Sequence, residues 1–306
     1  MNVRAPSPQS AVHSPRFRVA FTLIELLTVI AIIGLLAVLA APIFKQFSKG
    51  DVTVAAGRQM LDDLARARQL AISRRSTVYM VFIQTNFWND PYQPSMTGNM
   101  WPNVVNFAPQ IAASTIVTQM YAGQWCGYYI ESLRNVGDQP GRGSPQDLVR
   151  LRILPPGSFI DPMKFTNQIF PFTNGVQYPT NRPDLPIYGF RLTNNIPFPT
   201  ADLLTNQNFV NDMNRLGHPY VMVPYIAFNY LGQLTPGDGS LLPYDENIPI
   251  AYGTIVAPYN PTTKATIQGL PTATEIPPNN SMSISYNVIH IDHLTGRARL
   301  ERQEVQ

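Results

Sequence analysis

The chain has 306 residues, with 22 basic and 19 acidic side chains and a net charge of +3. This length is sufficient for a domain with its own hydrophobic core. The C-terminal part carries no cluster of Lys and Arg, which argues against nucleic acid as a partner because nucleic-acid binding requires a basic face. Cys126 is the only cysteine, so no intramolecular disulfide can form, and we expect it to be a small buried residue.

One apolar stretch near the N-terminus contains a single charged residue. It runs from Phe21 to Phe44, 24 residues, and the charge is Glu25. As a helix it would be about 36 Å long, more than the about 30 Å of a bilayer core, so we predict a membrane-spanning helix over 21–44. A carboxylate in such a segment is costly, and we expect it to have a partner.

The residues before this stretch, 1–20, have the charge of a cytoplasmic leader. They contain three arginines and no acid, and basic flanks stay in the cytoplasm. We therefore expect a single-pass membrane protein with its N-terminus in the cytoplasm and its C-terminal head outside. Subtracting the three arginines from 22 basic residues leaves 19 against 19 acids, so the remaining chain is neutral.

Two residues are expected to shape the apolar helix. Gly34 has no side chain, and it either permits close packing of a neighbouring helix or is simply tolerated, as Gly often is in membrane helices. Pro42 lacks a backbone donor and clashes with the preceding turn, which predicts a kink or local melting near Val38 to Pro42.

The run from Ala20 through Phe21 to Glu25 and on to Pro42 resembles the type IV prepilin N-terminal signature, shared by pilins and pseudopilins. The resemblance implies cleavage by prepilin peptidase between Ala20 and Phe21, N-methylation of Phe21, and a role for Glu25 in filament assembly. The family usually has Gly before the cut, whereas this chain has Ala20. The partners implied are prepilin peptidase, other pilins or pseudopilins, an inner-membrane assembly platform and membrane lipid. The location implied is the inner membrane, with the head in the periplasm.

The chemistry of this motif is consistent with assembly. Removal of the leader gives Phe21 a free α-amine, which can pair with Glu25 of a neighbouring subunit already in place. Such pairing repeats by heterologous, non-closing contacts and makes a filament. Two alternatives remain open: a plain signal anchor that tolerates Glu25, and a secretory signal peptide cleaved among the small residues Ala37 to Ala41.

An amphipathic helix is predicted over 45–75, after a break at Ser48 to Asp51. Apolar residues recur there at three- and four-residue spacing and predict a face that packs on a globular head; they are Met60, Leu61, Leu64, Ala67, Leu70 and Ala71.

The remainder, 76–306, reads as a β-rich head. Short β-branched and aromatic runs alternate with Pro, Gly and Asn, and eight of them are predicted to be strands: 77–83, 125–133, 148–154, 187–192, 220–230, 248–255, 283–291 and 297–301. The predicted fold class is α+β, with a long N-terminal helix, membrane-spanning in its first half, packed on a C-terminal antiparallel sheet.

Three short pieces of the head resemble GspH/FimT-type minor pseudopilins: the helix end 65–72, the strand and turn 226–232, and the closing 295–300. The head is longer than that group requires. The extra length, 84–143 and 165–184, reads as long loops rich in Asn, Pro and aromatic residues, which either cover the sheet or bind a partner subunit or glycan.

No catalytic constellation stands out, so we expect no enzyme and no cofactor. His290, Asp292 and His293 are the only local cluster with metal-binding residue types, but a strand would place His293 on the opposite face from the other two. We therefore predict no metal. The expected function is that of a minor pseudopilin or pilin-like subunit of a type II secretion or type IV pilus filament; the alternative is a membrane-anchored exported binding protein outside a filament.

Processing gives the first test. N-terminal sequencing of the mature protein is expected to begin at Phe21, with an N-methylated amine. A mature N-terminus beyond Ala37 would instead indicate ordinary signal peptidase.

Overall fold

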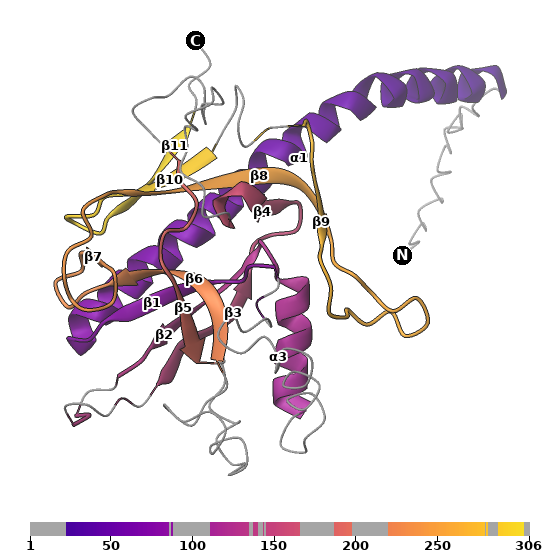
Figure 1. Ribbon diagram of the computed structural model, residues 1–306. Helices are drawn as coiled ribbons and strands as arrows, with labels where there is room; N and C mark the ends of the chain where they lie inside the picture. The colour runs from indigo at the N-terminus through magenta and orange to yellow at the C-terminus, as the bar shows by residue number, and fades with distance from the viewer. Residues whose placement is uncertain are drawn as a thin grey trace, which may run out of the picture. The chain divides into compact units, whose positions relative to one another are not determined.

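The computed structural model describes residues 23–85, 87, 111–134, 137–139, 143, 145–165, 187–197, 220–278, 280 and 287–302. The chain divides into two compact units, residues 1–48 and residues 49–306, and we call the second unit the head. Helix α1, Leu23–Arg74, has 52 residues and contributes to both units (Figure 1).

The strands of the head form two antiparallel sheets. The first has the order β3-β2-β1-β6-β5, with β7 paired to β6; its strands are β1 Val78–Phe82, β2 Gly127–Ser132, β3 Gln146–Ile153, β5 Thr193–Pro197, β6 Tyr220–Phe228 and β7 Leu234–Thr235. The second has the order β11-β10-β8-β4, with β9 paired to β8; its strands are β4 Ser158–Ile160, β8 Glu246–Val256, β9 Thr272–Glu275, β10 Asn287–Ile291 and β11 Ala298–Arg302. Helix α3, Ile111–Ala122, and a 3-10 turn, Pro162–Phe165, complete the described elements.

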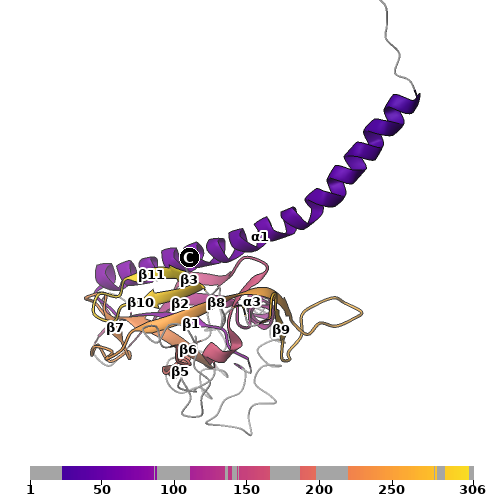
Figure 2. The same ribbon diagram turned by 90° about the horizontal axis from the view of Figure 1, so that it is seen from above.

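The main core lies between α1 and both sheets. Five residues of α1 are fully buried and recur at helical spacing: Ala56, Met60, Leu64, Ala67 and Ala71. They belong to one cluster with β1, β2 and β6 of the first sheet and with β8 and β10 of the second. Figure 2 shows α1 running along the strands of the head. The predicted amphipathic face is therefore confirmed as core.

A second core covers the opposite face of the first sheet. Alternate residues of β1, Tyr79 and Val81, join Tyr129 of β2 in this cluster, because successive strand residues point to opposite faces. Val117 and Met120 of α3 belong to the same cluster. All five residues of β1 are buried, as expected for a central strand with both faces covered.

Seven of the eight predicted strands coincide with observed ones, with boundaries shifted by a few residues. The exception is 187–192, which is irregular and leads into β5 at Thr193. The prediction of loop over 84–143 is wrong at Ile111–Ala122, where α3 forms. That segment has no charged residue and packs on the sheet, so its few polar side chains give a weak helical pattern.

The expected fold class and localisation need correction. Across the described residues, α1 included, the structure contains no helix with the length and apolar character needed to cross a membrane. The membrane-spanning first half and the single-pass inner-membrane placement are therefore not supported. The single expected sheet is also replaced by two.

The predicted break at Ser48 to Asp51 is wrong, because the helical backbone continues through it. One interior Gly costs a helix only about 1 kcal/mol, and Gly50 is followed by a strongly packed helical stretch. Pro42 also lies within α1. Its side chain is outside the described residues, and the kink there stays a prediction.

A junction of two turns and α1 closes one end of the head. Arg68 of α1 donates from Nε to the carbonyl of Gly232 at 3.2 Å and to the carbonyl of Thr295 at 2.7 Å. Gly296 has φ +61°, and a Cβ placed on it would lie 1.9 Å from the Gly232 oxygen. The turns that follow β6 and β10 therefore pack backbone against backbone, which only glycine permits at this point.

Gly296→Ala is expected to destabilise the protein by about 2–4 kcal/mol, because it combines a backbone clash with a left-handed φ. Gly239→Ala is the control: its φ is +89° but no atom lies within 4 Å of the added Cβ, so only about 1 kcal/mol of backbone strain is expected. The measurement is the urea unfolding midpoint of each variant. Equal midpoints for the two variants would contradict the close approach of the turns.

Candidate functional site

The predicted processing residues, Ala20 and Phe21, lie outside the described residues. Glu25 lies in the first turn of α1 and is exposed. Gly34 is helical, and no atom lies within 4 Å of a Cβ built on it. The room beside Gly34 is consistent with the predicted close approach of another helix, although that approach stays a prediction.

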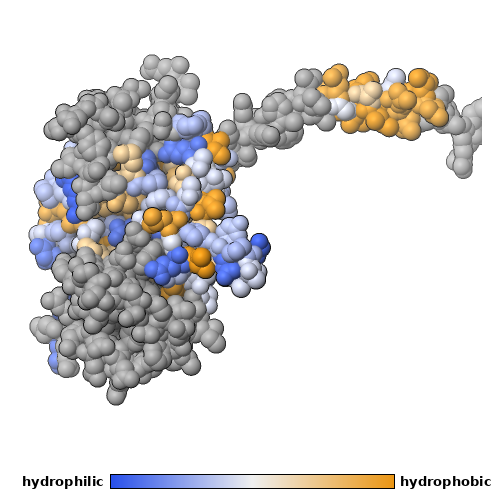
Figure 3. Space-filling view, turned by 45° about the vertical axis from the view of Figure 1, so that its right-hand side comes forward, coloured by the Kyte–Doolittle hydropathy of each residue, from blue (hydrophilic) through white to orange (hydrophobic). Residues whose placement is uncertain are grey.

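The most unusual surface of the described chain is the apolar segment, which we define as Leu23–Leu36. Every one of its residues is exposed. Its ten large apolar side chains are 44% to 82% exposed, with Val29 the least and Leu23 the most. Figure 3 shows their hydrophobic surface. Soluble monomers rarely expose contiguous apolar patches of this extent, so the segment has the character of a contact surface.

Charged side chains join α1 to the first sheet inside the head. Asp63 is buried and pairs with Arg152 of β3, with Nη1 to Oδ1 at 2.8 Å. Tyr128 of β2 donates its hydroxyl to the other oxygen of Asp63 at 2.6 Å. The arrangement satisfies both carboxylate oxygens and fixes the rotation of α1 about its axis.

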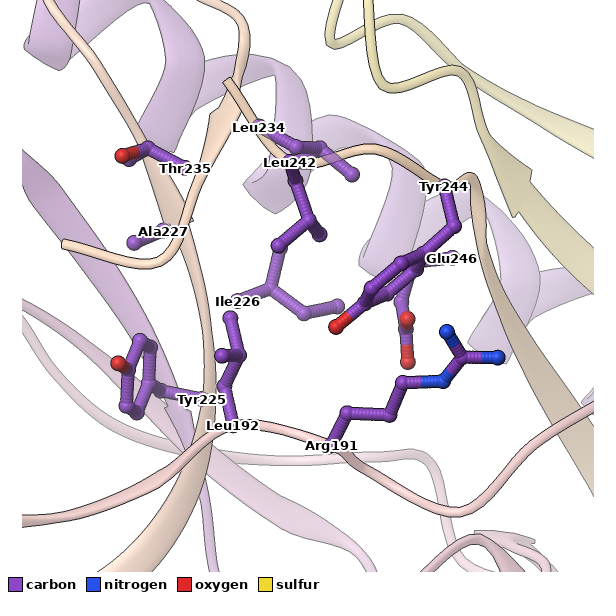
Figure 4. A pocket seen from close by; sticks show the side chains of 10 residues that line it. All are labelled: Arg191, Leu192, Tyr225, Ile226, Ala227, Leu234, Thr235, Leu242, Tyr244 and Glu246. Atoms are coloured by element: carbon purple, nitrogen blue, oxygen red, sulfur yellow. The ribbon is translucent and has the colours of Figure 1, made fainter. Parts of the chain in front are cut away.

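A second ionic cluster lies beside the small cavity of Figure 4, whose wall includes Arg191 and Glu246 of this cluster. Lys164 is buried and donates to Glu246 and, at 2.8 Å, to the carbonyl of Tyr188. Burial lowers the pKa of Lys164, while Glu246 opposes that shift. The guanidinium of Arg191 stacks between the rings of Tyr188 and Tyr244, with distances of 4.1 and 3.9 Å to their centroids.

The cavity itself has room for about one water molecule. Leu192, Ile226, Leu234 and Leu242 form much of its wall. A space of this size cannot hold an organic substrate, which typically needs a few hundred Å³. We therefore interpret the cluster of Lys164, Glu246 and Arg191 as a structural link between the sheets.

The histidine cluster differs from its expected arrangement. His293 lies in the turn after β10, and both its backbone N–H, at 2.8 Å, and its Nδ1, at 2.6 Å, contact Asp245 Oδ1. Nε2 of His290 lies 3.5 Å from the other oxygen of Asp245. The two histidines thus converge on one carboxylate, which the strand alternation did not predict. Within the described ranges, no group of three or more His, Cys, Asp or Glu is placed to hold a metal ion.

The remaining sequence features have separate places. Cys126 is buried as expected, and burial raises the pKa of its thiol to about 12. Phe87 is buried against Tyr121, at 5.7 Å between ring centroids, as an aromatic anchor would be. The other aromatic residues of Asn86 to Tyr92, and Phe170 to Phe172, lie outside the described residues.

Sequence reasoning missed the residues that join elements. Arg68, Asp63 and Asp245 gain their partners only when distant strands come together, so no local pattern marks them. One local feature of the sequence did mark such a junction. The three pieces that resemble minor pseudopilins, 65–72, 226–232 and 295–300, meet in the junction of Arg68, Gly232 and Gly296.

Comparison with protein-family models, with curated proteins and with solved structures finds no match to this chain. The assignment of a function therefore depends on the chemistry of the chain itself.

Glu131 of β2 is a buried carboxyl with an unusual environment. It is 1% exposed, stands beside Asp147 on β3, and its Oε2 has no hydrogen-bond partner among the described residues. Burial raises the pKa of Glu131 well above its ordinary value, and the charge of Asp147 raises it further. The folded protein therefore favours the protonated acid.

This raised pKa predicts a pH dependence of stability. In the unfolded chain Glu131 ionises near pH 4.5, whereas the folded chain holds the proton to a higher pH. Glu131 therefore contributes most to the free energy of unfolding below pH 4.5, and this contribution is lost as the pH rises toward the folded-state pKa. Glu131→Gln keeps the neutral form and is expected to be more stable than wild type at pH 8, with the difference shrinking toward pH 4. Urea unfolding across this range measures it. If the unfolding midpoints of Glu131→Gln and wild type changed with pH in parallel, the raised pKa of Glu131 would be contradicted.

Proposed function

We propose that this protein is a pilin-like subunit, of the minor pseudopilin kind, that is processed by prepilin peptidase and enters a filament of a type II secretion or type IV pilus system. The observation that carries the proposal is the exposed apolar segment with one carboxylate, continuous in α1 with a stretch that forms the core of the head. Helix α1 thus contains an exposed apolar segment and a second stretch that is buried in the core of the head.

The apolar segment supplies the driving force for assembly. Fully burying one large apolar side chain is worth about 1.5–3 kcal/mol, and ten of them are exposed here. Against equivalent segments of other subunits, the total exceeds about 10 kcal/mol even after allowance for partial burial. Parallel packing of one such helix against the next makes heterologous contacts that do not close, so they extend into a filament.

Glu25 fixes the axial position of one subunit against the next. It is the only charged residue of the apolar segment, so it is the one point at which an incoming subunit can form an ion pair. The α-amine created by cleavage before Phe21 is the matching cation. Pairing satisfies both charges inside an apolar bundle, where either alone would be costly.

The described features of the head support a structural or binding role. The described cavity accommodates about one water, and the described polar clusters are ion pairs that link strands and helix. An exported binding protein that stays outside a filament is the second candidate. Such a binding protein would have the same head, but its Glu25 would meet no neighbouring subunit. Substitution of Glu25 therefore distinguishes the two candidates.

Glu25→Ala is expected to leave cleavage intact, because Ala20 and Phe21 are unchanged, and to lower incorporation into filaments by a factor of a hundred or more. Losing one member of a buried ion pair costs about 3–5 kcal/mol. Thr28→Ala, which removes an uncharged polar group one turn away, is the matched control and should incorporate normally. The measurement is the ratio of processed protein in sheared filaments to that in cells. Equal incorporation of the two variants would favour the binding protein.

A further inference from the structure

Among the ion pairs of the described residues, the one between Lys164 and Glu246 is the most deeply buried. The two side chains are 1% and 8% exposed. Lys164 belongs to the 3-10 turn Pro162–Phe165, and Glu246 begins β8. The two residues are 82 positions apart, and the chain between them contains β5, β6 and β7. Their contact therefore closes a long loop that runs through the first sheet.

The segment that follows in space holds the amine of Lys164 in place. The carbonyl of Lys164 accepts from the N–H of Phe190 at 2.7 Å, and Nζ donates to the carbonyl of Tyr188 at 2.8 Å. The same Nζ contacts Oε1 of Glu246. The centroid of the buried Phe190 ring lies 4.7 Å from Nζ. The nitrogen and the carboxyl group are thus held together and shielded from bulk water, and such positioning strongly favours a reaction between them.

The surroundings also favour an uncharged amine. Burial lowers the pKa of Lys164, and the charge of Arg191 lowers it further, while Glu246 opposes the shift. A buried ion pair can remove the cost of both charges by passing one proton from the ammonium group to the carboxylate. The result is a neutral amine, which is a nucleophile, in contact with a neutral carboxylic acid.

We propose that Lys164 and Glu246 condense in the folded protein to an amide that joins the two side chains covalently. The lone pair of Nζ attacks Cδ of Glu246 and a C–N bond forms. The bond from Cδ to the hydroxyl oxygen breaks, and the hydroxyl group leaves as water with one proton from Nζ. Nothing is oxidised or reduced. The inference is independent of the apolar segment and of filament entry.

The cavity beside the pair is suited to this step. Figure 4 shows the guanidinium of Arg191 and the carboxyl group of Glu246 on the same side of the cavity. A positive charge there stabilises the negative oxygen that develops as the amine attacks. The cavity has room for about one water molecule, the amount that the condensation releases. Exclusion of further water protects the amide from hydrolysis.

The amide would supply a covalent link that cysteine cannot supply in this chain. Cys126 is the only cysteine, so no intramolecular disulfide can form. A bond between residues 164 and 246 closes the same long loop permanently, which lowers the conformational entropy of the unfolded chain. The turn after β4 would then stay attached to β8 even when the hydrogen bonds between these strands open.

The first test is the intact mass of the full chain, purified folded and measured after denaturation. Wild type is expected to be lighter than its sequence mass by one water, whereas Lys164→Met should have its full sequence mass. N-terminal processing changes both proteins equally, so the comparison between them is unaffected. The double variant Lys164→Met, Glu246→Gln removes both charges and serves as an unlinked reference that leaves no buried carboxylate unpaired. Wild type at its full sequence mass would overturn the proposal.

The second test locates the bond. Trypsin does not cleave after a lysine whose side chain is an amide, so a digest of wild type is expected to contain one branched peptide that includes both Lys164 and Glu246. The pair of Arg152 and Asp63 is the internal control, because a guanidinium does not condense in this way and its peptides should stay separate. Cleavage after Lys164, with the Glu246 peptide recovered alone, would show an ordinary ion pair and overturn the assignment.

Discussion

The head depends on the burial of one face of α1 between two sheets. The first sheet and the second sheet each contribute to the cluster that contains Met60 and Leu64, so the helix supplies core to both. Neither sheet could bury its inner face in the same way without the helix, because a sheet needs a second layer to cover its apolar side. The apolar spacing of α1 is therefore the constraint from which the packing of the head follows.

Polar contacts then select one arrangement of these layers. Asp63 fixes the rotation of α1 through Arg152 and Tyr128, while Arg68 fixes the ends of two turns through their carbonyls. Buried and half-buried ionic contacts of this kind add modestly to the free energy of folding, but each is strongly unfavourable when misaligned. They hold α1 in one rotation and one axial position against the two sheets.

The sequence predicted those elements that have a clear local pattern of apolar residues. The stripe of α1 and most strands could be predicted because their spacing reports burial directly. Helix α3 could not, since it carries no charge and resembles a loop. The convergence of His290 and His293 on Asp245 depends on the pairing of β8 with β10, which places Asn247 opposite His290, and no local pattern contains that pairing. For the candidate site, the sequence predicted Glu25 and the apolar segment. The predicted membrane span was wrong, because the described residues contain no helix that is long and apolar enough to cross a membrane.

The contact between the two ends of the head has a consequence for the timing of synthesis. Leu300 of β11 packs beside Gly57 of α1, within 3.2 Å of the position of a Cβ there, so the last strand covers a helix that is made among the first residues. During translation this part of the apolar face of α1 therefore stays uncovered until β11 has been made. Chains that end early leave this face open to chaperones and proteases.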